Sequence, residues 1–247
     1  MGQAVEDWKE YLKENENYSR AEILEALRNA AVITDTQLEY SLRKKVRNGE
    51  LVRTGWGHYA LPGKSVYSPS YSPEALSVVN VLLGEFSCLD YRIFELRELN
   101  DFLNHLVSHN TVFVSVEGTM MNFVFDALWS KYPGKVMLKP NADEYYRYRQ
   151  DGMIVVLRLP SETPKGNGRI WESRLEKILV DVLCDRLISS VVPEEEKRNI
   201  VENAFRDYPV DMNTLYHYAR RKGAAEKVRE LLMEYQPTHG ASPGIRQ

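Results

Sequence analysis

The chain has 247 residues, of which 43% are apolar and 27% are charged, and its formal net charge at pH 7 is −3. These values are typical of a globular protein with one large domain or two smaller ones. No run approaches the roughly 20 apolar residues of a membrane helix, and the charged, amphipathic N-terminus does not fit a secretory signal. Cys88 and Cys184 match no metal-ligand spacing, so we expect free, buried thiols in a reducing cytoplasm.

The start of the chain predicts three short helices. Residues 4–14 carry apolar side chains at helical spacing. Ser19 and Glu22 form a capping-box pattern at the start of a second helix, which a short link separates from a third. Thr34 can cap the third helix, because its hydroxyl can accept a hydrogen bond from an unpaired backbone N–H group.

The third helix has one apolar face and one basic face. Leu38, Leu42 and Val46 recur every four residues and form the apolar stripe. Asn48 and Gly49 then supply the left-handed stop that ends many helices. The opposite face is polar and basic, and it carries Thr36, Gln37, Tyr40, Arg43, Lys44 and Arg47.

A two-stranded hairpin is predicted after this helix. Residues 51–53 and 58–61 alternate as short strands, and the glycine-flanked residues 54–57 supply the turn. Only Glu50 opposes the local cations, which are Arg43, Lys44, Lys45, Arg47, Arg53 and Lys64. Because basic side chains at this density attract phosphates, helix and hairpin together predict a winged helix-turn-helix that binds double-stranded DNA. The alternative is a solvated amphipathic helix beside a hairpin.

The predicted DNA contacts divide by their expected roles. Residues early on the helix are expected to meet base edges, and these are Thr36, Gln37 and Tyr40. Basic residues further along are expected to meet phosphates, and these are Arg43, Lys44 and Arg47. The hairpin adds Arg53, Trp56 and His58. Arg43 could instead pair with a guanine, and Trp56 could either stack near the minor groove or plug the domain's own core.

The rest of the chain predicts a larger second domain. Residues 65–73, rich in proline and serine, form a linker after the winged helix-turn-helix domain of residues 1–64. Residues 74–235 form the second domain, and residues 236–247 are expected to be a disordered tail. Strands are expected at 88–96, 111–116, 136–138 and 153–159, and helices at 73–84 and 120–132. After a flexible stretch at 160–168, helices follow at 173–188, from Pro193, at 211–221 and at 224–235. The predicted fold class is α+β, with an N-terminal winged helix-turn-helix and a C-terminal mixed α/β domain that ends in a helical subdomain.

Several segments resemble one known family when they are taken in order. These are NGELVRTGWGHYAL, TVFVSVEG with FVFDALW, VMLKP, RLEKILVDVL and YPVDMNTLYHYARRKG. Together they resemble the AbiEi-type antitoxins of type IV toxin–antitoxin systems over residues 19–235; residues 1–18 lie outside the pattern. The resemblance implies a cytoplasmic autorepressor of a phage-defence (abortive infection) operon, with an operator of inverted repeats. It also implies a C-terminal domain that opposes a nucleotidyltransferase-like toxin, with or without direct contact.

The second domain shows no pattern that is typical of catalysis. Glu117 ends a strand, but no lysine follows at the spacing that a metal-dependent nuclease uses. His105 and His109 have the i,i+4 spacing of two helix-borne metal ligands, yet they lack the glutamate that zinc hydrolases place after the first histidine. Residues 166–168, Gly-Asn-Gly, are interpreted as a turn. We therefore predict no enzyme activity, no cofactor and no metal site.

Asp181 and Asp185 lie one helical turn apart and have two interpretations. They can form structural salt bridges with Lys177, with Arg186 or with the basic run at residues 220–222, or they can form an interaction surface for the antitoxin role. Two other functions also remain open. One is a ligand-responsive repressor whose second domain binds a small molecule, and the other is a nuclease-like enzyme that a winged helix targets to DNA.

Overall fold

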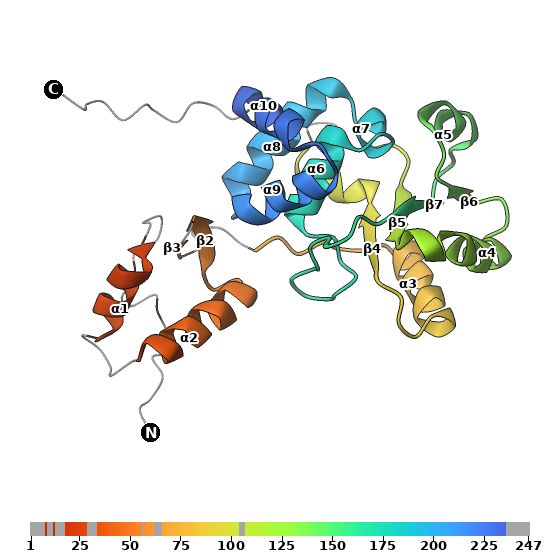
Figure 1. Cartoon of the computed structure of the whole chain (residues 1–247). Coiled ribbons are helices and arrows are strands. Elements are labelled where there is room, and N and C mark those ends of the chain that lie inside the picture. Colours follow the sequence, from red (N-terminus) through yellow and green to blue (C-terminus); the bar gives the residue numbers. More distant parts are fainter. Residues whose placement is uncertain are drawn as a thin grey trace.

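The N-terminal elements form a small unit beside a larger C-terminal unit (Figure 1). The computed structural model describes residues 8, 12, 18–28, 34–55, 57–61, 66–103 and 107–235. Helices and strands are present in both units, which confirms the predicted α+β class. Within these described residues, no helix is both long enough and apolar enough to cross a membrane.

The N-terminal unit packs two helices against a three-stranded antiparallel sheet. Its elements are β1 (Tyr18–Ser19), α1 (Arg20–Arg28), α2 (Asp35–Arg47), β2 (Val52–Gly55) and β3 (His58–Ala60). The strand order is β1-β3-β2, so the strand before α1 pairs with the second strand of the hairpin. The core is closed by apolar side chains from both helices and the sheet, including Ile23, Leu27, Leu38, Leu42, Leu51 and Tyr59.

Local signals set both ends of α2. The Thr34 Oγ1 atom accepts a hydrogen bond from the Gln37 N–H group, and Gln37 Oε1 accepts one from the Thr34 N–H group at 2.9 Å, which completes a capping box. Asn48 caps the other end, and Gly49 follows with φ +73°. A Cβ atom at Gly49 would lie 2.5 Å from Val66 Cγ2, so glycine is required there for space as well as for conformation.

The C-terminal unit is built on a four-stranded mixed sheet. Its first elements are α3 (Pro73–Glu85), β4 (Tyr91–Glu95), β5 (Thr111–Val116), α4 (Met121–Lys131), β6 (Val136–Leu138), α5 (Ala142–Tyr148) and β7 (Met153–Arg158). Short 3-10 helices lie at Leu96–Asp101 and Gly118–Met120. The strand order is β4-β5-β7-β6, with β4 antiparallel to β5 and the other neighbours parallel. The strands and helices predicted here are confirmed, whereas α5 was not predicted.

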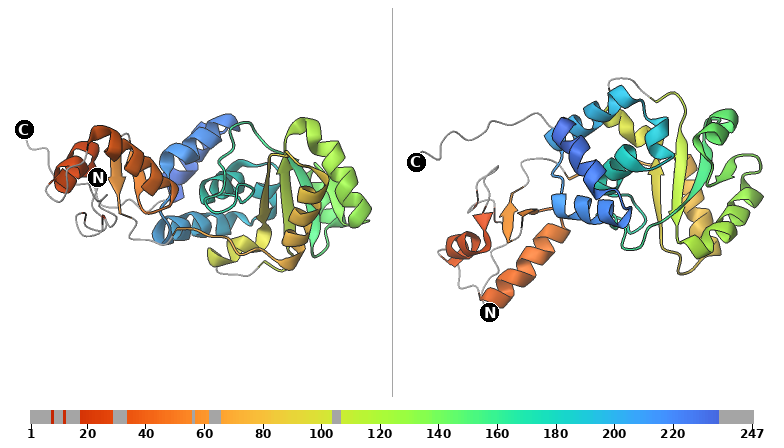
Figure 2. Two further views of the ribbon diagram at one scale, coloured as in Figure 1. Left: turned by 90° about the horizontal axis from the view of Figure 1, so that it is seen from below. Right: turned by 45° about the horizontal axis from the view of Figure 1, so that its top comes forward.

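Helices cover both faces of this sheet (Figure 2). On one face, α3 and α4 pack against the side chains of Ile93, Val114 and Val156. On the other, Phe94 and Phe113 stack with ring centroids 5.8 Å apart and contact the helical layer. Successive side chains of each strand therefore enter two separate cores on opposite faces of the sheet. This explains why these strands are apolar almost throughout.

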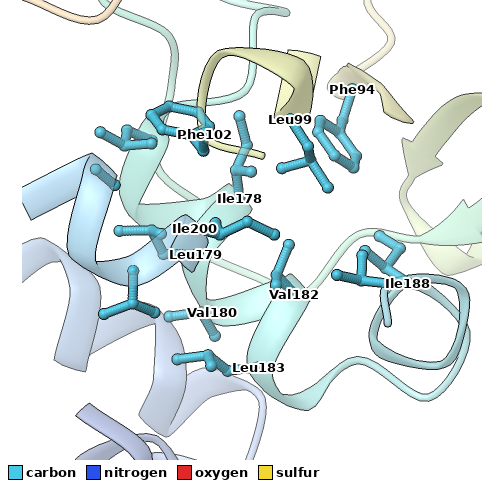
Figure 3. Close-up of a cluster of buried hydrophobic side chains, with 14 of the residues drawn as sticks. Phe94, Leu99, Phe102, Ile178, Leu179, Val180, Val182, Leu183, Ile188 and Ile200 are labelled. Atoms are coloured by element: carbon cyan, nitrogen blue, oxygen red, sulfur yellow. The ribbon is translucent and has the colours of Figure 1, made fainter. Parts of the chain in front are cut away.

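The helical end of the chain surrounds one buried helix. This helix is α6 (Leu175–Cys184), and it is followed by α7 (Ile188–Val191), α8 (Glu194–Asp207), α9 (Met212–Arg221) and α10 (Ala225–Tyr235). Figure 3 shows Ile178, Leu179 and Leu183 of α6 within the apolar cluster. The single helix predicted at 173–188 is wrong. Asp185 ends α6, and its Oδ1 atom accepts N–H hydrogen bonds from Leu187 and Ile188, which starts α7.

Two stretches predicted as irregular are held firmly by the core. Residues 66–72 have no regular structure, but the Tyr67 ring is buried among the rings of Phe102 and Tyr208. The stretch at 160–168, expected to be flexible, is anchored because the buried Arg92 guanidinium donates to the carbonyl oxygens of Thr163 and Pro164. The predicted tail at 236–247 lies outside the described residues, as does most of the helix predicted at 4–14.

Candidate nucleic-acid interface

The predicted contact residues of α2 form an exposed stripe along the helix. At about 100° per residue, Thr36, Tyr40, Arg43 and Arg47 share one face. Tyr40 is 70% exposed and the Arg43 side chain is 79% exposed. Gln37 and Lys44, also exposed, lie on the flank of the stripe. Each α2 residue predicted to contact DNA is therefore open to solvent.

The cations of this stripe differ in how strongly they are paired. Arg43 Nη2 lies 3.0 Å from Glu39 Oε1, one helical turn away. Lys44 and Arg47 form no ion pair with any described residue. An exposed pair such as Arg43 with Glu39 is weak and can exchange for a phosphate contact. The outward charge of α2 thus rests mainly on Lys44 and Arg47.

Lys45 corrects the predicted charge count. The sequence predicts it to be one of the outward cations, but only 12% of its side chain is exposed. Its Nζ atom lies 2.5 Å from Glu50 Oε2 and 5.4 Å from the centre of the Trp8 ring. Lys45 therefore joins the end of α2 to the loop before β2 and to the buried tryptophan. It is a structural residue.

Gln37 takes part in the N-terminal cap of α2, in addition to its predicted contact with bases. Its Oε1 atom accepts from both the N–H and the Oγ1–H groups of Thr34. Only the Nε2 amide group of Gln37 therefore remains for a base edge while the cap is intact.

The hairpin places its predicted residues at different depths. Arg53 is half-buried and pairs across the sheet with Tyr59, whereas His58 is exposed at the start of β3. A bulge between Arg53 and Gly55 breaks the register of the two strands. The Arg20 N–H group donates to the Gly57 carbonyl at 2.9 Å and so ties the turn to α1. Trp56 lies outside the described residues.

A cleft of about 1140 Å³ separates the N-terminal unit from the C-terminal unit. On one side it is lined by α2 and β2, and on the other by residues 162–174, α9 and α10. The contacts between α9 and β2 hold the two sides together, and Figure 2 shows α9 beside the N-terminal unit. The part of α2 that lines the cleft is the side that carries Leu42 and Val46. Gln37 and Lys44 do not line it.

The cleft lining carries more cations than carboxylates, although Arg43, Arg174 and Arg229 pair with Glu39, Glu176 and Glu226. Its seven cationic side chains are Arg43, Arg47, Arg53, Lys165, Arg174, Arg220 and Arg229, and its carboxylates are Glu162 and Asp211. Glu162 is shared between His217 at 3.1 Å and Arg221 at 3.4 Å. The residues that sequence reasoning missed are those of the C-terminal side. The signals that could have found them are the basic loop PKGNGR at 164–169 and the basic end of α9.

Asp181 lies at the centre of a buried ionic network. Its two carboxylate oxygens each accept a hydrogen bond at 2.7 Å, one from Lys177 Nζ and one from Lys222 Nζ, and Tyr218 OH also donates to it. Burial alone would raise the pKa of Asp181, but the two ammonium groups hold it below its ordinary value. Asp181 is 2% exposed, so the salt-bridge interpretation holds for it and the interaction-surface interpretation does not.

A second buried polar group joins β4 to the linker. Glu95 accepts hydrogen bonds from Ser72 Oγ–H and Asn110 Nδ2–H, both at 2.6 Å, and the Glu98 carboxylate accepts from Tyr67 OH and from the Glu95 N–H group. Burial raises the pKa of Glu98 to about 8. This perturbed carboxyl faces packed side chains, so we assign it a structural role.

No metal site emerges from the described residues. They contain no group of three or more His, Cys, Asp or Glu side chains that could hold an ion. His109 lies in a bend and not in a helix, and His105 lies outside the part of the chain that the structure describes.

One family model matches most of the chain. It covers residues 37–238 and carries the description "Family of unknown function (DUF6577)". The match includes most of α2, the hairpin and the whole C-terminal unit. A search of curated proteins finds no match.

Proposed function

The chain belongs to the DUF6577 family, whose function is unknown, and we propose that it is a DNA-binding transcriptional regulator. In this proposal the outer face of α2 enters a groove of duplex DNA, with the hairpin against the backbone beside it. The observation that carries the proposal is the exposed basic stripe on a helix that precedes a β-hairpin. Winged-helix proteins use this combination to place a recognition helix.

The stripe has the chemistry that both kinds of DNA contact require. Thr36 and Tyr40 offer hydroxyl groups at the start of α2, where a recognition helix meets base edges. Arg43, Lys44 and Arg47 offer cations further along the helix, where phosphates lie. The capping box at Thr34 and the packed core beneath α2 fix the position of the helix that carries these side chains before DNA arrives. A rigid helix that carries unpaired cations loses little entropy on binding a polyanion.

The resemblance to AbiEi-type antitoxins extends the proposal to the operon. It supports repression of the chain's own promoter through inverted repeats, and an antitoxin role for the C-terminal unit against a nucleotidyltransferase-like toxin. Co-expression tests the second part: the full chain should restore growth to cells that express the toxin from the neighbouring reading frame. If it does not, the antitoxin role is removed and DNA binding is unaffected.

DNA binding is tested by a pair of substitutions on α2. Lys44→Ala with Arg47→Ala should weaken binding to a duplex of about 30 base pairs from upstream of the reading frame, long enough for two half-sites. The slope of log K against log salt should shrink by about two, because each phosphate contact contributes about one. The control is Lys131→Ala with Lys135→Ala, two exposed lysines near α4 at the far end of the molecule (Figure 1). Equal affinity and equal slope for the two double variants would overturn the proposal.

A further inference from the structure

The cleft between the two units brings together cations that no described carboxylate neutralises. Arg47 on α2, Lys165 in the glycine loop and Arg220 at the end of α9 all line it, and none of the three forms an ion pair with a described residue. Like charges held around one space repel each other, and an anion that enters this space removes the repulsion.

The acidic lining does not cancel this charge. Asp211 caps α9, where its Oδ1 atom accepts from the N–H groups of Asn213 and Thr214. Glu162 lies between His217 and Arg221. Neither carboxylate forms an ion pair with Arg47, Lys165 or Arg220.

The glycine loop at residues 165–168 lines the same space. A Cβ atom at Gly166 would lie 2.3 Å from the Arg169 backbone carbonyl oxygen, so this position excludes a side chain. The N–H groups of residues 165–168 donate to no described residue. Successive free N–H groups beside a lysine are typical of anion-binding loops.

We propose that this cleft is a binding site for a small phosphate-bearing ligand of the nucleoside polyphosphate class. Its volume of about 1140 Å³ lies just above the usual range of small-ligand sites, about 300–1,000 Å³. Cations from both sides can then meet different phosphate groups of one ligand. Tyr59 of β3 and the half-buried Tyr216 of α9 are rings that line the cleft on its two sides, where a base could contact them.

Such a ligand would also regulate the proposed DNA contact. Arg43 and Arg47 line the cleft and also belong to the stripe on α2. A bound polyphosphate neutralises them and fixes α2 against the C-terminal unit, so ligand and DNA compete. This competition rests on the proposed function, whereas the ligand site itself does not.

Binding of inorganic tripolyphosphate and of ATP to the full chain, measured by calorimetry at low salt, tests the site. Lys165→Gln with Arg220→Gln should weaken binding of both probes at least tenfold. The matched control, Lys131→Gln with Lys135→Gln, removes the same charge far from the cleft and should leave the affinity unchanged. Thermal unfolding at the wild-type temperature shows that each variant is folded.

Duplex DNA separates the two possible sources of phosphate. The proposal expects the Lys165 and Arg220 double variant to bind the 30-base-pair duplex as the wild type does, and expects ATP to displace the duplex from the wild type only. Absence of tripolyphosphate and ATP binding, or equal loss in both double variants, overturns the proposal. Loss of duplex binding without any binding of free phosphates also overturns it, because the cleft then holds the DNA backbone. If the Lys44 and Arg47 double variant binds the duplex as the wild type does, the proposed competition between ligand and DNA is removed. The proposed ligand site is unaffected by that result.

Discussion

Lys222 at the end of α9 donates to Asp181 in the middle of α6, with Nζ 2.7 Å from Oδ1. The same ammonium group lies 2.5 Å from Asp185 Oδ2, the residue that ends α6. Asp181 also holds Lys177, whose side chain is 2% exposed. Two ammonium groups, one on α6 and one at the end of α9, therefore depend on one buried carboxylate.

Asp181→Ala should lower the free energy of unfolding by about 3–5 kcal/mol, because it leaves a buried ammonium group without its partner. Urea unfolding at neutral pH measures the change. Asp126→Ala, at an exposed position on α4, should stay within about 0.5 kcal/mol of the wild type. A loss of the same small size at Asp181 would show that the network does not support the helical layer.

Glu98 should make stability depend on pH above the acidic range. Its carboxyl titrates near 4.5 when unfolded and near 8 in the folded protein, because burial opposes its charge. The folded state therefore binds more protons between these values, and stability falls as the pH rises through this window. The slope for one group reaches about 1.4 kcal/mol per pH unit.

Glu98→Gln removes this dependence, because glutamine does not titrate. Urea unfolding at several pH values should show a flatter profile between pH about 5 and 8, and Glu85→Gln at the exposed end of α3 serves as the control. An unchanged profile in the Glu98 variant would mean that another group titrates in this window.

Two glycines should respond to alanine in opposite directions. Gly49→Ala places a side chain at φ +73° and against Val66, and should cost more than about 1 kcal/mol. Gly84→Ala lies within α3 with open space around the new methyl group, and should add about 0.5–1 kcal/mol. Thermal unfolding and amide hydrogen exchange in α2 and α3 measure both. Stabilisation by Gly49→Ala would contradict the conclusion that only glycine fits at this position.

The two cysteines should differ in reactivity. The prediction of buried thiols is wrong for Cys88, which is exposed, whereas Cys184 is half-buried and its thiol donates to the Val180 carbonyl oxygen at 2.9 Å. Burial raises the pKa of Cys184 to about 11, which reduces the thiolate fraction at neutral pH. Iodoacetamide should therefore alkylate Cys88 first, as mass spectrometry of the folded protein can show. Equal rates would indicate that the end of α6 opens.

The elements that could be predicted from sequence are those with local signals. Thr34 and Asn48 define α2 within a single stretch of chain, and the β-branched run of β5 marks a buried strand at Thr111–Val116. The segment at α5 was missed although Asn141 and Glu144 form a capping box, because its seven residues show no apolar periodicity.

The features that could not be predicted depend on contacts between distant parts of the chain. Lys45 looks like an outward cation until Trp8 and Glu50 are placed beside it. The cleft lies between α2 and residues more than a hundred positions later in the chain. Apolar periodicity predicts single helices and strands and does not predict how two units are oriented. The basic stripe on α2 was therefore predictable, whereas its continuation into a shared cleft was not.

Strand β7 lies between β5 and β6, although it follows both of them in the chain. During synthesis on the ribosome, β5 and β6 therefore emerge before the strand that will join them. Their apolar edges stay open until Met153–Arg158 has left the exit tunnel. Products truncated before this strand should therefore aggregate, and we expect pairing through this late strand to slow the folding of the C-terminal unit.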